Sequence, residues 1–398
     1  MEEKKTWDLI SIASIPLIMT LGNSMFIPVL PAIEKELGIS SFQVSMIITV
    51  YSVVAIIFIP LAGYLSDQFG RKTVIVPSII IAGLGGLLAG IASWKSDNAY
   101  PFIIVARLLQ GIGAAGASPI VMPLVGDIFR RESEVSEGLG IIETANTFGK
   151  VLSPIIGAML ASVVWYLPFF AFPVFCLISL IMMIFLVKTP HKNERPLKFQ
   201  EFIHNIQQIF KTEGRWLVSI FVIGGICMFV LFGVLFYLST MLEEDFQIDG
   251  VKKGIILAIP LGALCLTAYA AGKNLGESKV RMKWTGVFGI FILACSVFAI
   301  SFSKDIYVLL TALFTSGIGI GLALPGLDAL ITQGIEMSKR GTISSIYSSM
   351  RFVGVAAGPP AFALMMKGSH FFLFFANTLL CILALFISLF GIKPEKDA

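Results

Sequence analysis

The sequence predicts an all-α membrane protein with twelve transmembrane helices in two pseudo-symmetric six-helix bundles. Of its 398 residues, 56% are hydrophobic and only 14% are charged, whereas a soluble domain carries roughly 25% charged residues. Apolar runs of about 20 residues, the length that a helix needs to cross a bilayer, recur along the whole chain. Glycine and proline patterns of the first half return in the second half. This composition excludes a soluble enzyme, a nucleic-acid-binding protein and a disordered scaffold.

Charged or turn-forming clusters separate twelve apolar runs. The predicted spans are residues 8–31, 41–64, 73–94, 100–127, 139–162, 165–188, 216–240, 251–272, 284–303, 306–333, 343–366 and 370–392. An even number of spans places both termini on one side of the membrane. If that side is the cytoplasm, the inner segments hold 20 of the 29 Lys and Arg residues, the outer segments hold six, and three lie within spans. Because cytoplasmic loops are enriched in Lys and Arg, both termini are expected in the cytoplasm.

The longest cytoplasmic segment, residues 189–215, divides the chain into an N-terminal bundle of residues 1–188 and a C-terminal bundle of residues 216–398. Apolar residues such as Phe202, Ile206 and Ile209 recur in this segment at helical spacing. The spacing predicts an amphipathic helix that lies in the cytoplasmic interface and links the bundles. An ordinary linker with some apolar residues is the alternative.

Two pairs of spans repeat the same small-residue pattern. The offset is 206 residues between the fourth and tenth spans and 205 between the fifth and eleventh. The matching sets are Gly111, Gly113 and Pro119 with Gly317, Gly319 and Pro325, and Gly149, Ser153 and Pro154 with Gly354, Gly358 and Pro359. Gly116 and Gly321 each add a further glycine to the first pair of spans. These offsets indicate duplication of a six-helix unit. In transporters built from two such halves, the substrate site lies between them near mid-membrane.

Arg107 is the most informative single residue, because an arginine within a span is costly and must face a cavity or a partner. No carboxylate lies within two turns of it on the same predicted helix. Backbone carbonyls, Gln110 and Asn23 are its candidate partners. A purely structural role is the alternative to a role in transport.

A polar stripe is predicted on the fifth span, where residues three, four and seven positions apart share one helix face. Its members are Glu143, Asn146, Thr147 and Lys150. Glu143 is either a titrating carboxylate that faces the cavity or part of a structural network with Arg130 or Arg131.

Asp328 and Arg351 lie at comparable depths in consecutive spans, roughly 8 and 12 Å from the inner side at 1.5 Å per residue. An ion pair between them is therefore feasible. A static pair would be structural, whereas a pair that opens when Asp328 is protonated would couple the proton to helix movement. Tyr347 lies one turn before Arg351 on the same face.

Met228, Phe232 and Phe236 follow one another at four-residue spacing on the seventh span. Methionine and aromatic surfaces accommodate varied apolar ligands, so Met228 and Phe232 are candidates for the cavity wall. Ordinary lipid-facing positions are the alternative, and the one that the abundance of phenylalanine in the sequence favours.

Three motifs resemble the major facilitator superfamily, and specifically its 12-span drug:proton antiporter family. The loop after the second span reads Gly63-Tyr-Leu65-Ser-Asp67-Gln-Phe-Gly70-Arg71-Lys72 and is similar to the superfamily's loop signature. The fourth span contains Arg107-Leu-Leu-Gln110-Gly111-Ile-Gly113-Ala114-Ala115, similar to the proton-linked motif. The fifth contains Gly149-Lys-Val-Leu-Ser153-Pro154-Ile-Ile-Gly157-Ala158, which resembles the antiporter motif except that Ser153 and Ala158 replace glycine.

The resemblance implies proton-coupled efflux of amphipathic drugs or related small molecules by alternating access. A carrier for one specific metabolite, lipid or ion is the alternative. The expected setting is a bacterial-type plasma membrane, with a monomeric multi-pass protein whose partners are its substrate, protons and the lipid bilayer, and no nucleic acid. No enzymatic activity, cofactor or metal is expected. Because no Walker-type phosphate loop is present, ATP is not expected to drive transport directly.

Residue roles follow from these patterns and from the resemblance. Proton coupling is expected at Arg107, Glu143, Asp328 and Arg351. The substrate cavity is expected to involve Asn23, Gln110, Asn146, Lys150, Met228, Phe232 and Tyr347. A cytoplasmic gate is expected from Gly63, Asp67, Gly70, Arg71, Lys72 and Asp127, with an Arg71–Asp127 ion pair. Close helix packing is expected at Gly149, Ser153, Pro154, Gly157, Gly358 and Pro359.

Overall fold

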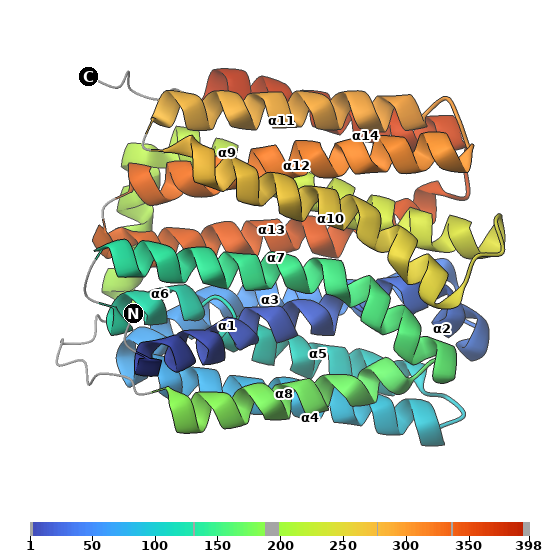
Figure 1. Cartoon of the computed structure of the whole chain (residues 1–398), viewed down its shortest axis with the longest axis horizontal. Helices are drawn as coiled ribbons and strands as arrows, with labels where there is room; N and C mark the ends of the chain where they lie inside the picture. The colour runs from blue at the N-terminus through green and yellow to red at the C-terminus, as the bar shows by residue number, and fades with distance from the viewer. Residues whose placement is uncertain (1–2, 130–131, 188–198, 277, 336, 393–398) are drawn as a thin grey trace. The chain divides into compact units, whose positions relative to one another are not determined.

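The computed structural model describes residues 3–129, 132–187, 199–276, 278–335 and 337–392, and within them it contains helices and no strand. The helices are α1 (Glu3–Ser24), the 3-10 helix η1 (Ile27–Val29), α2 (Leu30–Leu37), α3 (Ser41–Phe69), α4 (Arg71–Lys95), α5 (Tyr100–Ala117), α6 (Val121–Ile128), α7 (Glu132–Val163), α8 (Leu167–Leu186), α9 (Phe199–Glu244), α10 (Gly250–Leu275), α11 (Lys279–Ile300), α12 (Ile306–Gly334), α13 (Met337–Met365) and α14 (His370–Gly391). Figure 1 shows them as long rods that run side by side within each part of the chain.

Every predicted span coincides with helical structure in the described residues, and ten segments there are long and apolar enough to cross a membrane. Helices α7 and α13, the predicted fifth and eleventh spans, are not among these ten. Both contain ionisable residues within the predicted spans, Glu143 and Lys150 in α7 and Arg351 in α13.

The first and fourth spans are broken, although the sequence analysis predicts them as single runs. The first consists of α1, η1 and α2, and the break coincides with Pro28 and Pro31. The fourth consists of α5 and α6, and Pro119 lies in the break. Proline lacks the backbone N–H that a helix interior requires, so these apolar runs bend without losing their length.

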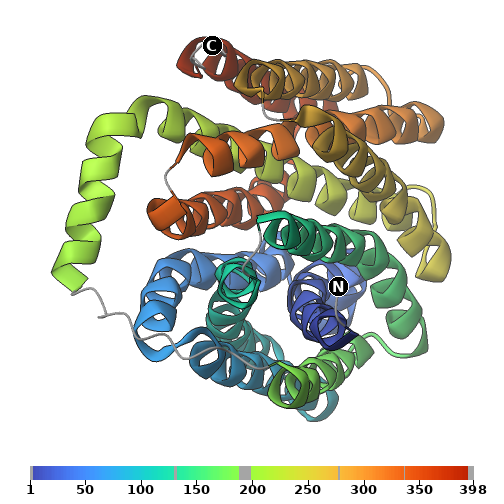
Figure 2. The same ribbon diagram turned by 60° about the vertical axis from the view of Figure 1, so that its left-hand side comes forward.

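The chain divides into two compact units. Unit 1 comprises Met1–Phe202 and Ser239–Ile255, and unit 2 comprises Ile203–Leu238 and Ile256–Ala398. Residues Ser239–Ile255, which lie in the predicted C-terminal bundle, therefore pack with unit 1. The described part of the predicted linker helix, residues 199–215, is helical, and α9 continues from Phe199 through it into the seventh span. Its ribbon bends sharply in Figure 2, and residues 188–198 of the linker lie outside the described residues.

The internal repeat extends to individual packing contacts. In unit 1, a Cβ on Gly111 would lie 2.5 Å from the Tyr51 carbonyl oxygen, so α5 can approach α3 this closely only with glycine there. In unit 2, Gly317 occupies the equivalent place on α12, and a Cβ added to it would clash with the Pro260 carbonyl of α10. Small residues allow such close backbone approach between membrane helices.

Candidate functional site

The loop motif forms a compact polar cluster at the predicted cytoplasmic end of unit 1. Gly70 has φ +95°, a backbone conformation that favours glycine, and this turn joins α3 directly to α4. The turn places Arg71 between two carboxylates, with nitrogen–oxygen distances of 2.6 Å to Asp67 and 3.1 Å to Asp127. Arg71 also donates to Ser66 Oγ at 2.6 Å. The expected Arg71–Asp127 pair is therefore present, and it links α4 to α6.

Lys72, which the sequence analysis places in the gate, has a different set of partners. Its Nζ donates to the carbonyl oxygens of Ile184 at 2.9 Å and Val187 at 2.7 Å, where α8 ends. A lysine ammonium is favourable there because the last carbonyls of a helix have no partner within the helix. In unit 2, Lys283 donates in the same way to Leu389 near the end of α14, at 3.0 Å. The lysine contact is thus part of the repeat.

Arg107 is completely buried in unit 1 and is surrounded by neutral acceptors. Its guanidinium donates to the Ile47 carbonyl at 2.7 Å, to the Gly22 carbonyl at 3.0 Å and to Asn23 Oδ1 at 2.9 Å. A short hydrogen bond to Gln110 Oε1 completes the set. All three candidate partner types are therefore used, and they come from α1, α3 and α5.

Two aromatic rings also contact the Arg107 guanidinium. Its Cζ lies 4.5 Å from the ring centre of Tyr51 and 5.0 Å from that of Phe26. Such contacts stabilise a cation that is removed from water. The site therefore holds a fixed positive charge with hydrogen bonds and ring faces rather than with an opposite charge.

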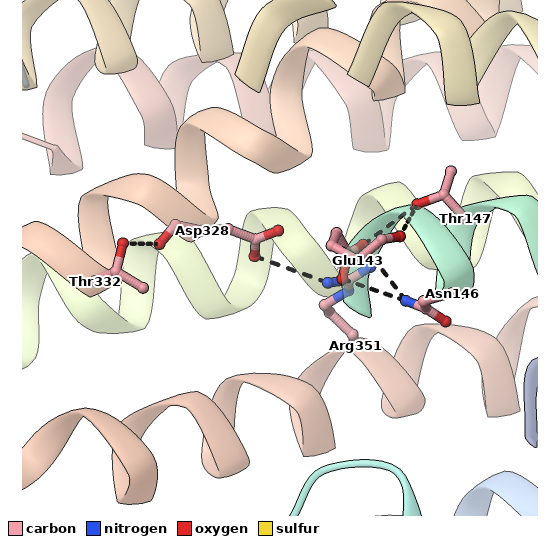
Figure 3. A network of polar contacts seen from close by, with 6 residues as sticks. All are labelled: Glu143, Asn146, Thr147, Asp328, Thr332 and Arg351. Carbon is pink, nitrogen blue, oxygen red and sulfur yellow. Dashed lines mark hydrogen bonds and ion pairs between the residues drawn. The ribbon is translucent and has the colours of Figure 1, made fainter. Parts of the chain in front are cut away.

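The polar stripe on α7 is present and turns toward α1. Asn146 Oδ1 accepts a hydrogen bond from Thr20 Oγ1 at 2.6 Å, and Asn146 Nδ2 donates weakly to Glu143 at 3.4 Å. Thr147 donates to the Glu143 backbone carbonyl at 2.8 Å. Figure 3 shows Glu143, Asn146 and Thr147 together. Lys150 is buried, and Arg130 and Arg131, the alternative partners of Glu143, lie outside the described residues.

Asp328 on α12 and Arg351 on α13 form the feasible ion pair in unit 2, with 3.8 Å between Nη1 and Oδ1 (Figure 3). This distance lies at the outer limit for an ion pair. The Asp328 side chain is 37% exposed and that of Arg351 is 17% exposed. A carboxylate that is partly exposed can exchange a proton.

Met228 and Phe232 are buried, with 3% and 6% of their surfaces exposed. The favoured lipid-facing interpretation is therefore wrong for both. Phe236 on the same stripe is buried as well.

The antiporter motif packs α7 against α1. A Cβ on Gly149 would lie 3.0 Å from the Leu17 carbonyl oxygen, and one on Gly157 would clash with the Met25 carbonyl. Ser153 Oγ donates to the Gly149 carbonyl at 2.6 Å, so serine fits where the family has glycine because its hydroxyl is bonded within its own helix.

Two further contacts extend this packing scheme. The Pro154 carbonyl faces Gly254 of α10 within unit 1. In unit 2, Gly358 packs on the Phe229 carbonyl, as the repeat predicts, and Pro359 follows it within α13.

Two polar contacts near the predicted outer ends of the spans were not anticipated. His370, the first residue of α14, forms hydrogen bonds through both ring nitrogens, to Tyr237 Oη and to the Ile300 carbonyl, each at 2.8 Å. Lys253 is buried and forms an ion pair with Glu243 at 2.7 Å. Both residues lie at span ends, where sequence alone does not distinguish a buried side chain from a solvated one.

Comparison with known proteins identifies the family. The family model of the Major Facilitator Superfamily matches residues 12–359 and 279–397. The chain belongs to the major facilitator superfamily. It is therefore a membrane transporter with a small-molecule substrate rather than an enzyme, and the relatives support the drug:proton antiporter type within the superfamily.

Relatives of this superfamily member include an exporter and a drug resistance protein. The chain is 54% identical to the "Bacillibactin exporter" of Bacillus subtilis, over 98% of this chain and 97% of the relative. It is 26% identical to the "Tetracycline resistance protein, class E" of Escherichia coli, covering 88% and 85% of the two chains.

Solved structures show the same fold. The human organic anion transporter MFSD10 (TETRAN) superimposes with a TM-score of 0.77 at 16% identity, over 98% of this chain and all of the other. A bacterial homologue of the human lysosomal transporter Spinster gives a TM-score of 0.78 at 13% identity, covering 98% and 97%.

Proposed function

We propose that this transporter exports a siderophore of the bacillibactin kind from a bacterial cell. The observation that carries the proposal is the 54% identity with the bacillibactin exporter along nearly the whole length of both chains. The proposal favours a specific substrate over broad drug efflux, which was the leading interpretation of the motifs.

The energy source in this proposal is the proton gradient. Asp328 is the principal proton carrier, because its carboxylate is partly exposed and lies 3.8 Å from the Arg351 guanidinium, whose charge its protonation would leave uncompensated. Glu143 is the second candidate, since it lies in the half-buried polar stripe of α7. Moving one elementary charge across the membrane potential supplies about 2.3 kcal/mol per 100 mV. Arg107 does not carry the proton in this proposal. Its fixed positive charge holds α1, α3 and α5 of the N-terminal half together through hydrogen bonds.

Alternating access in this proposal comes from rocking of two halves joined by the 189–215 segment, within a monomer. The ratio of 20 cytoplasmic to six outer basic residues supports cytoplasmic termini in the plasma membrane. The Arg71 cluster with Asp67 and Asp127 then lies on the cytoplasmic side, where it acts as a gate.

Polyspecific drug efflux is the second candidate function. Its support is the similarity to tetracycline and multidrug resistance proteins, which extends over most of the chain but at 24 to 26% identity. The buried Met228 and Phe232 would suit apolar ligands.

A strain that makes bacillibactin but lacks its own exporter separates the two candidates. Expression of this chain is expected to restore bacillibactin in the medium, measured by mass spectrometry, with little change in resistance to a panel of drugs. A protonophore is expected to abolish the export. Broad drug resistance without restored bacillibactin export would favour the second candidate, and export that is indifferent to the protonophore would refute proton coupling.

A further inference from the structure

Tyr347 of α13 lies in a slot on α9, and the slot depends on the absence of a side chain at Gly224. A Cβ at Gly224 would lie 2.7 Å from Tyr347 Cε2 and 3.0 Å from its hydroxyl oxygen. Phe221, one turn earlier on α9, stacks on the same ring with 5.9 Å between ring centres and 29° between planes. Tyr347 is only 4% exposed, so its ring has little freedom to move.

The ring of Tyr347 in turn supports Arg351. The Arg351 Cζ lies 5.6 Å from the ring centre, within the range of a cation–π contact. The same guanidinium reaches Asp328 only at 3.8 Å. Arg351 thus contacts an aromatic face and a carboxylate at the same time, and neither contact is at its closest distance.

We infer that Tyr347 is a positioning residue that holds Arg351 at the edge of ion-pair distance from Asp328 and so makes that carboxylate easier to protonate. Without the ring, Arg351 would be able to close on Asp328. A tighter ion pair favours the charged carboxylate and therefore opposes protonation. The slot formed by Phe221 and Gly224 fixes the ring in the place where it can restrain the guanidinium.

The groups that act on this pair within unit 2 come from three helices. Asp328 lies on α12, Tyr347 and Arg351 lie on α13, and the buried thiol of Cys227 lies beside them on α9. The Tyr347 hydroxyl makes no hydrogen bond in the described part of the chain. Asp328 is the nearby carboxylate whose charge the hydroxyl experiences. The inference therefore assigns the main role to the ring rather than to the hydroxyl.

The inference rests on the proposed proton-coupled export, and one experiment tests both. The full chain is purified and reconstituted in proteoliposomes, and bacillibactin transport under an imposed pH gradient is measured over a series of pH values. The variants are Tyr347→Leu, which removes the ring, Gly224→Ala, which displaces it, and Tyr347→Phe, which keeps it. Gly262→Ala is the matched control, because a Cβ at Gly262 meets no atom within 4 Å.

Tyr347→Leu and Gly224→Ala are expected to move the pH of half-maximal transport downward by about one unit. A shift of about one pKa unit corresponds to a free energy similar to that of a partly desolvated cation–π contact. Tyr347→Phe and Gly262→Ala are expected to keep the pH profile of the unaltered protein. If both ring-perturbing variants keep that profile, or move it upward, the positioning role is wrong while proton coupling stands. If the unaltered protein transports bacillibactin without any pH dependence, both proposals are wrong.

Discussion

The buried Arg107 allows the sharpest prediction, because the substitution Arg107→Lys keeps the charge and changes only its geometry. The guanidinium makes four hydrogen bonds, to the carbonyls of Ile47 and Gly22 and to the side chains of Asn23 and Gln110. An ammonium has three donors, so at least one of these acceptors loses its charged partner.

A hydrogen bond to a charged group contributes about 1.5–3 kcal/mol. The loss of one such bond in the conformations that Arg107 stabilises corresponds to about a 10- to 150-fold change in their population. Weaker contact with the Tyr51 ring would add to this effect. We therefore expect Arg107→Lys to slow bacillibactin export at least about tenfold.

The assay is the initial rate of export from cells, normalised to the amount of folded protein in the membrane, together with the melting temperature of the purified protein. Arg281→Lys is the matched control, since Arg281 is exposed and donates a single 3.3 Å hydrogen bond to the Asn274 carbonyl. An Arg107→Lys rate within twofold of the control would refute this reasoning. A lowered melting temperature with an unchanged normalised rate would restrict Arg107 to a structural role.

Three further predictions follow from single contacts. Asp127→Asn removes the negative charge that pairs with Arg71 and is expected to lower the export rate while costing less than about 1 kcal/mol of stability; an unchanged rate would argue against the gate. Gly157→Leu is expected to separate α7 from Met25, which follows the end of α1, with a loss of about 1–3 kcal/mol measured by thermal unfolding, and a stable variant would contradict the close packing. His370→Phe removes two hydrogen bonds and is expected to cost about 1–3 kcal/mol in the same measurement, whereas an unchanged melting temperature would mean that the histidine does not anchor the start of α14.

The positions of the spans could be predicted from sequence because the bilayer imposes a length on each apolar run. The continuity of the helices could not. Pro28 and Pro119 break apolar runs that remain long enough to span, so the hydropathy pattern does not reveal the breaks. A helix in the linker could be predicted from its apolar spacing, but not that this helix continues past Lys211 and Arg215 into the seventh span as one element.

The part of the candidate site around Arg107 could be predicted, because a charged residue within a membrane span costs free energy unless it has a partner. Arg107 needs acceptors in the membrane, so the prediction of Asn23, Gln110 and backbone carbonyls followed from the residue itself. Its specific carbonyl partners could not be predicted, because Gly22 and Ile47 belong to helices whose packing is visible only in three dimensions. The slot at Gly224 that holds the Tyr347 ring could not be predicted for the same reason.

The two halves share the packing contacts of the repeat but differ in their charged residues. The glycine contacts of α5 and α12 and the lysine contacts of α4 and α11 occur in both units. The charged residues do not: the position 206 residues after Arg107 is Leu313, and the position 205 residues before Arg351 is Asn146.

Because of this difference, we expect the two sites to have distinct tasks in the proposed transport cycle. Arg107 is satisfied by groups that do not titrate near neutral pH, so its charge is constant through a transport cycle. The partner of Arg351 is a carboxylate, which changes its charge when it binds a proton. We therefore expect Arg107 variants to reduce export equally at every pH, and Asp328→Asn to abolish the dependence of export on the pH gradient. If Arg107→Lys instead alters the pH profile and Asp328→Asn leaves it intact, the assignment of the two tasks must be reversed.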